Sequence, residues 1–152
     1  MISTKLNAEA VRDVLLYLEQ NLEYNDTEYE AQKIIEPISV QTLVKVLTPS
    51  EHYTDDEVRY AAKKLWENQM IHAKVSTGTR GDFLNFQVLD ITWSGHEFLN
   101  NVRPQTIWEI TKDKAGKLGG MSIKMLSFLS STIIQAVASN PELIQGIVND
   151  LK

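Results

Sequence analysis

The side chains best suited to chemistry lie between Thr54 and Met70, where the spacing of apolar residues predicts an amphipathic helix. Its apolar side carries Val58, Ala61, Ala62 and Leu65, and its polar side carries Arg59, Tyr60, Lys63 and Lys64. An arginine can pair with guanine through two hydrogen bonds, and a lysine can contact a phosphate. The polar side is therefore a candidate surface for reading DNA.

Acidic residues on the same helix argue against this interpretation. Asp55, Asp56, Glu57 and Glu67 outweigh the three bases, although acids at a helix start also complement the positive end of the helix dipole. The whole chain has a net charge of −5 and a pI of about 5.2, a balance that disfavours non-specific attraction to phosphates. A solvated face, or one that binds protein, stays open as the alternative.

A second set of bases lies in a predicted hairpin. Two runs rich in β-branched and aromatic residues, 70–77 and 83–92, flank the glycine-containing turn at 78–82, a typical hairpin pattern. Lys74 and Arg80 could touch the DNA backbone, with His72 nearby, but Asp82 and the scarcity of further bases weaken this surface.

No pattern in the sequence indicates catalysis. There is no cysteine, and His52, His72 and His96 are far apart, so a metal site would need an unusual ligand set. The glycines at 116–120 lack the spacing of a phosphate-binding loop, and no serine stands in a nucleophile elbow. We expect a protein that is not an enzyme and has no cofactor or metal.

The helices and strands expected around these bases follow one another along the chain in an order that predicts a fold. Asn7, Ser39 and Thr54 are candidate N-caps for three helices, and Pro49 is expected to stop the second. An extended segment is expected at 33–38. This order predicts a mainly helical α+β domain over residues 1–103, a winged helix-turn-helix with the hairpin as wing; a generic α+β domain is the alternative.

A helical extension is expected over residues 104–152. Thr92 or Ser94 should cap the helix before it, and Asn140 a last short helix. Residues 121–137 are apolar on nearly every side but shorter than the roughly 20 residues that span a bilayer. We expect them to bury against a second copy or a partner, rather than in their own core or a membrane. The candidate interface residues are Trp108, Met125, Leu126, Leu129, Ile133 and Val137.

One run of the sequence carries a family pattern. It comprises Gly95, His96, Phe98, Leu99, Arg103, Ile107, Trp108, Gly119 and Gly120. With these residues the chain resembles domain of unknown function family 2513, which is common in phages, prophages and their bacterial hosts. The resemblance implies a winged-helix-like fold and a mobile-element setting, and it assigns no catalytic residue. Trp93 departs from the pattern, because members often carry a proline or a small residue there.

Two functions follow as hypotheses. The first is a cytoplasmic, homodimeric DNA-binding regulator of phage or prophage type, with helix 54–70 in the major groove of duplex DNA. The alternative is a non-catalytic interaction module with the same fold, an inhibitor or adaptor of a host protein. Neither requires a membrane, and the N-terminus lacks the pattern of a signal peptide.

Overall fold

The computed structural model describes residues 5–22, 36–51, 53–119, 121–140 and 142. The first half of the expected extended segment at 33–38, His52, Gly120 and nearly all of the expected last helix lie outside these residues. The chain divides into two compact units, residues 1–95 and residues 96–152. Each unit is described by itself.

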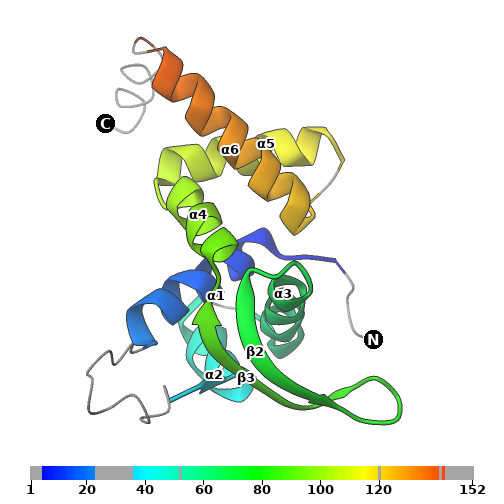
Figure 1. Cartoon of the computed structure of the whole chain (residues 1–152). Helices are drawn as coiled ribbons and strands as arrows, with labels where there is room; N and C mark the ends of the chain where they lie inside the picture. The colour runs from blue at the N-terminus through cyan, green and yellow to red at the C-terminus, as the bar shows by residue number, and fades with distance from the viewer. Residues whose placement is uncertain (1–4, 23–35, 52, 120, 141, 143–152) are drawn as a thin grey trace, which may run out of the picture. The chain divides into compact units, whose positions relative to one another are not determined.

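Unit 1 combines three helices with a small sheet (Figure 1). Its elements are α1 (Ala8–Asn21), β1 (Ile38–Ser39), α2 (Val40–Glu51), α3 (Asp55–Glu67), β2 (Ile71–Thr77) and β3 (Phe83–Ile91). The three strands are antiparallel in the order β1-β3-β2, so β2 lies at an edge. The expected hairpin is confirmed, and its strands pair with Lys74 opposite Gln87.

The core of unit 1 forms where the helical stripes meet the sheet. Helix α3 packs against both α1 and α2, which brings three apolar faces together. The expected stripe of α3 is buried, and so are similar stripes in the other two helices: Val11, Val14, Leu15 and Leu18 in α1, Val40, Leu43, Val44 and Leu47 in α2, and Val58, Ala61, Ala62 and Leu65 in α3. Phe86 and Val88 of β3 close the core from the sheet side. Burial of these stripes fixes which side of α3 faces outward.

Side chains at the helix starts satisfy the free backbone N–H groups there. The Asn7 side chain accepts from the Ala10 N–H at 3.2 Å, and the Ser39 hydroxyl accepts from the Thr42 N–H at 3.2 Å. Thr54 and Glu57 form a reciprocal capping box, with N–H to oxygen distances of 3.2 and 3.0 Å. All three expected N-caps are confirmed.

Glu57 also ties the start of α3 to the start of α1, because the Asn7 amide donates to its carboxylate. This hydrogen bond, followed by the one from the Thr54 backbone, holds the pKa of Glu57 below its ordinary value of 4.5. Folding therefore favours the ionised form of Glu57. The ionised carboxylate adds to the free energy of unfolding in full at pH values above the pKa of Glu57 in the unfolded chain. This contribution is lost as the pH falls through the lower pKa of the folded protein.

Replacement of Glu57 by glutamine should therefore give a pH-dependent loss of stability. We expect the free energy of unfolding to fall relative to wild type at pH 6 to 8, and the difference to shrink below about pH 4.5. Urea unfolding of both proteins at pH 7 and pH 4 measures it. An equal difference at the two pH values would contradict the role assigned to the carboxylate.

The expectation that Pro49 ends the second helix was wrong. Helix α2 includes Pro49 and continues to Glu51. A proline here removes one helical hydrogen bond, because it has no N–H, and its ring crowds the carbonyl four residues earlier. The fixed φ of the ring is itself helical, and the last turn proceeds despite that loss.

At the start of α4 (Trp93–Val102), the backbone comes close to the residues that follow α3. Thr92 caps α4 by accepting from the Gly95 N–H at 3.0 Å, as one of the two expected caps. Its hydroxyl donates to the Gln69 carbonyl at 2.6 Å, and its N–H donates to the Met70 carbonyl at 3.0 Å. Thr92 thus fixes the start of α4 against the residues that follow α3.

Unit 2 continues from α4 with α5 (Gln105–Lys117) and α6 (Ile123–Ser139), which pack against each other. Pro104 precedes the first turn of α5, and Ser122 caps α6. The division between the units falls within α4, whereas the sequence-based boundary at 103 lies just after it. The described chain as a whole is mainly helical with a small antiparallel sheet, an α+β arrangement.

Candidate nucleic-acid interface

The outward side of α3 gathers the four residues expected to read DNA. Arg59 is exposed, and Tyr60, Lys63 and Lys64 are partly exposed. We call these four residues and Glu67 the α3 face. Since the opposite side of the helix is fully buried, the α3 face cannot rotate away from solvent without opening the core.

Glu67 engages both lysines of the α3 face. Its carboxylate lies 2.8 Å from the Lys64 Nζ and 3.9 Å from the Lys63 Nζ. The hydrogen bond to Glu67 raises the pKa of Lys64 above its ordinary value. Surface pairs of this kind contribute about 1 kcal/mol or less, so an incoming phosphate could displace the carboxylate from either lysine.

Aromatic rings complete the surroundings of the two lysines. The Lys64 Nζ lies 5.2 Å from the ring centroid of Tyr60, and the Lys63 Nζ lies 5.8 Å from that of Phe83. Arg59, in contrast, forms no hydrogen bond or ion pair with the residues that the structure describes. Its guanidinium is therefore the base most ready for a ligand.

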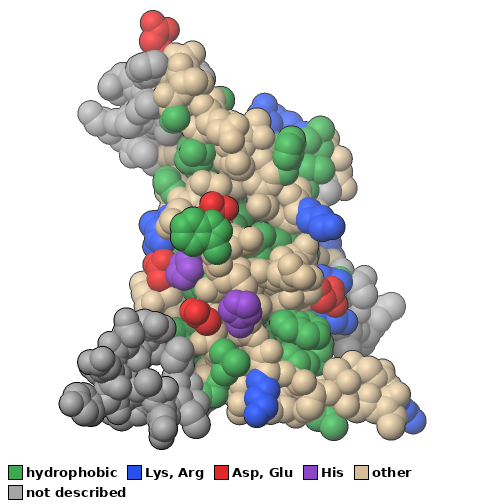
Figure 2. All heavy atoms as spheres, in the orientation of Figure 1, with side chains coloured by type: hydrophobic (Ala, Val, Ile, Leu, Met, Phe, Trp, Pro, Cys, Tyr) green, Lys and Arg blue, Asp and Glu red, His purple; other side chains and the backbone are tan. Residues whose placement is uncertain are grey.

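Exposed acids lie at the start of α3. Asp55 and Asp56 are both exposed, with the Thr48 hydroxyl 3.5 Å from one Asp55 oxygen. Acidic and basic side chains are also interspersed on the face drawn in Figure 2, with no large gathering of bases. The α3 face can offer directed contacts, but its surroundings give little general attraction for polyanions.

An aromatic cluster holds the hairpin beside α3. Trp66 meets Phe83 and Phe86 edge to face at centroid distances of 5.9 and 6.1 Å, and the two phenylalanines meet at 5.3 Å. Such pairs add about 0.5–1.5 kcal/mol each beyond the area they bury. This cluster was not predicted, and the position of Trp66 one residue after the buried Leu65 was the available signal in the sequence.

The hairpin carries the other two candidate bases. Lys74 and Arg80 are exposed, on β2 and in the turn respectively. The turn closes through the Gly78 N–H, which donates to the Asp82 carbonyl at 2.7 Å, and Gly81 takes a φ of +79°. Both bases are accessible, and among the described residues neither forms an ion pair with the α3 face.

The chain matches a family model described as Hypothetical protein (DUF2513) over residues 5–122. It belongs to the DUF2513 family. The family pattern expected between Gly95 and Gly120 lies inside the matched span, and the expected membership is confirmed. No curated protein and no solved structure matches the chain.

The described part of this DUF2513 chain also bears on metal binding and on membrane insertion. Among the described residues, no three His, Cys, Asp or Glu side chains lie close enough to hold a metal ion. His72 and His96 are exposed. Within the same part of the chain, no helix has both the length and the apolar composition to cross a bilayer.

The candidate interface residues of the C-terminal region fall into two groups. Trp108 and Leu126 are fully buried, so neither side chain is available to a partner. Met125, Leu129, Ile133 and Val137 are partly exposed along α6. Phe128, which was not among the candidates, is 66% exposed on the same helix.

Proposed function

We propose that residues 1–95 form a winged helix-turn-helix that binds duplex DNA, with α3 as the recognition helix and the β2–β3 hairpin as the wing. The observation that carries this proposal is the outward α3 face on a helix that follows α2 after residues 52–54 and precedes the hairpin. Two helices joined by a short turn, with the second exposed, are the arrangement that enters a major groove. From the family resemblance, we also propose a phage or prophage setting for such a regulator.

Each base of the α3 face has a role in this proposal. Arg59, with no competing partner among the described residues, pairs with a guanine edge. Lys63 and Lys64 leave the Glu67 carboxylate and bind phosphates of the DNA instead. Lys74 and Arg80 contact the DNA backbone from the wing. Recognition then depends on a few contacts rather than on a broad positive field.

A homodimer suits this mode of binding, because two copies of a recognition helix can read two half-sites one helical turn apart. The partly exposed residues Met125, Leu129, Ile133 and Val137 of α6 are the proposed contact between copies. Trp108 and Leu126 are excluded from it by their burial.

The Glu67→Gln substitution tests the proposal by a gain of affinity. Removal of this carboxylate leaves both lysines available to phosphates and deletes one repulsive charge, so we expect duplex affinity to rise about three- to tenfold at low salt. Fluorescence anisotropy of a labelled duplex that carries the upstream region of the gene measures the change.

The matched control is Glu109→Gln, which removes the same charge and a comparable pair, 3.2 Å from Lys112, on α5. It should leave affinity within about twofold. Equal changes in the two variants would mean that only net charge matters, and an unchanged affinity in Glu67→Gln would remove the α3 face from the proposal.

An interaction module for a host protein is the second candidate. The observation that favours it is charge: residues 1–95 hold fifteen acids against nine bases, and Asp55 and Asp56 are exposed at the start of α3. Such a surface repels phosphates and could suit a basic protein partner. A partner that co-purifies with the wild type, and is lost on Asp55→Asn with Asp56→Asn, would support this function over DNA binding.

A further inference from the structure

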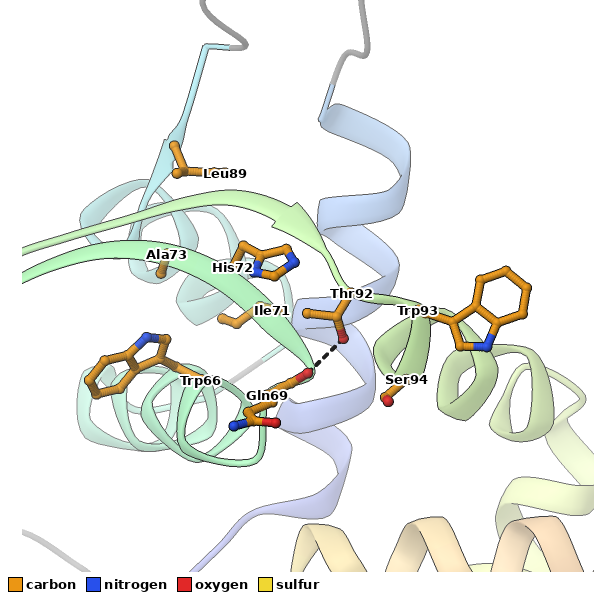
Figure 3. Close-up of a pocket in the computed structure, with 9 residues that line it drawn as sticks. All are labelled: Trp66, Gln69, Ile71, His72, Ala73, Leu89, Thr92, Trp93 and Ser94. Atoms are coloured by element: carbon orange, nitrogen blue, oxygen red, sulfur yellow. Dashed lines mark hydrogen bonds between the residues drawn. The ribbon is translucent and has the colours of Figure 1, made fainter.

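A hollow lies within unit 1 where the end of α3, the base of the hairpin and the start of α4 meet (Figure 3). Its volume is about 720 Å³, within the range typical of small-molecule sites. Ile71, Ala73 and Leu89 give it apolar surface, and two indoles and four polar side chains surround them. Nothing proposed above for DNA or protein binding uses this hollow.

Gln69 contributes to the hollow from a strained backbone. It has a φ of +59°, the left-handed region in which glycine is usual. The Gln69 N–H donates to the Trp66 carbonyl at 3.0 Å and the Met70 N–H to the Leu65 carbonyl at 2.9 Å, which is a Schellman ending of α3. A glutamine at this position costs roughly 1 kcal/mol relative to glycine, so the amide side chain invites a functional explanation.

Three of the four polar side chains of the hollow are available to a ligand. The side chains of Gln69, His72 and Ser94 form no hydrogen bond with any residue that the structure describes, whereas the Thr92 hydroxyl bonds to the backbone of Gln69 and Gly95. An amide, a neutral imidazole and a hydroxyl can each both donate and accept. Among the described residues, no lysine, arginine, aspartate or glutamate lines the hollow. A fitting ligand is therefore uncharged and carries both donors and acceptors.

Two indole rings favour a flat ligand. Trp93 is 79% exposed, and Trp66 is partly exposed while its contacts with Phe83 and Phe86 hold its ring in place. In Figure 3 the two rings lie on opposite sides of Gln69 and Thr92. Stacking of a planar heterocycle on an aromatic side chain is worth about 1–3 kcal/mol in nucleobase recognition.

We propose that this hollow binds a neutral, planar nitrogen heterocycle of about purine size. One face of the heterocycle stacks on an indole, and its edge exchanges hydrogen bonds with Gln69, His72 and Ser94. This binding does not depend on DNA recognition by the α3 face, and the two can succeed or fail separately.

Adenine and hypoxanthine, both uncharged near neutral pH, are the probes. The protein has three tryptophans, so a ¹⁵N-labelled sample should give three indole N–H signals. We expect saturable shifts of the Trp66 and Trp93 signals with a Kd of about 1 mM or tighter, and no shift of the signal of buried Trp108. Adenosine monophosphate should bind more weakly, because no lysine or arginine among the described residues lines the hollow to pair with its phosphate.

The decisive variant is Gln69→Gly, which removes the amide and relieves the strained backbone. It should weaken probe binding at least about fivefold while the melting temperature stays equal or rises. Gln41→Ala, on the exposed side of α2, is the control and should bind as wild type. Absence of shifts for both probes, equal shifts of all three indoles, or unchanged binding by Gln69→Gly would each overturn the proposal.

Discussion

Gly95→Ala should lower the free energy of unfolding by about 3 kcal/mol or more, one of the largest effects that any single methyl group could have in this protein. A Cβ at this position would lie 2.0 Å from the Met70 carbonyl oxygen and 2.7 Å from the Ile91 Cγ2. The carbonyl cannot withdraw cheaply, because it accepts from the Thr92 N–H and the Met70 residue that carries it is buried. The start of α4 would have to move outward.

The control for this prediction is Gly116→Ala in α5. Its added Cβ would meet only the Met121 Cε, at 3.7 Å, so the alanine should stabilise the helix by roughly 0.5–1 kcal/mol. Thermal melts followed by circular dichroism compare the three proteins, and about 6–12 °C should separate Gly95→Ala from wild type. A Gly95→Ala protein that melts with the wild type would show that the approach of Met70 to α4 is not as described.

The triple variant Arg59→Ala, Lys63→Ala, Lys64→Ala should lose about 100-fold or more in affinity for duplex DNA. The three side chains share the α3 face, and burial of the opposite side of the helix leaves no other surface of α3 to replace them. All three positions are solvent-accessible, so the fold should survive, which a circular dichroism melt checks.

The matched variant removes three lysines from unit 2: Lys114→Ala, Lys117→Ala and Lys124→Ala. It changes the net charge by the same amount, and we expect a loss of less than about fivefold. If the two triple variants lost affinity equally, the affinity for DNA would depend on the net charge of the protein, and α3 would not be the recognition helix.

Local signals explain why much of the fold was predictable. The caps at Asn7, Ser39 and Thr54 act within three residues along the chain, and the buried stripes follow from helical spacing alone. The hairpin could be predicted from the sequence because its strands flank a short glycine-containing turn. Pro49 was misjudged because a proline near a helix end has a helical φ and removes only its own N–H bond.

The candidate site was predictable only in part. The α3 face followed from periodicity, and Glu67 lies three and four residues after its lysine partners, a spacing that is visible in the sequence. The hollow was not predictable, because its lining comes from the residues at the end of α3, from the two strands of the hairpin and from the start of α4. The same is true of Gly95, whose requirement arises from a carbonyl 25 positions earlier in the chain.

A salt series of fluorescence anisotropy titrations measures DNA binding by the wild-type protein. Labelled duplexes, including the upstream region of the gene, are titrated between about 50 and 200 mM salt. We expect preference for one sequence, with an affinity that weakens by a slope matching about three to six phosphate contacts per subunit. No change in anisotropy for any duplex, even at about 50 mM salt, would rule out duplex DNA as the ligand and leave a protein partner as the ligand of this fold.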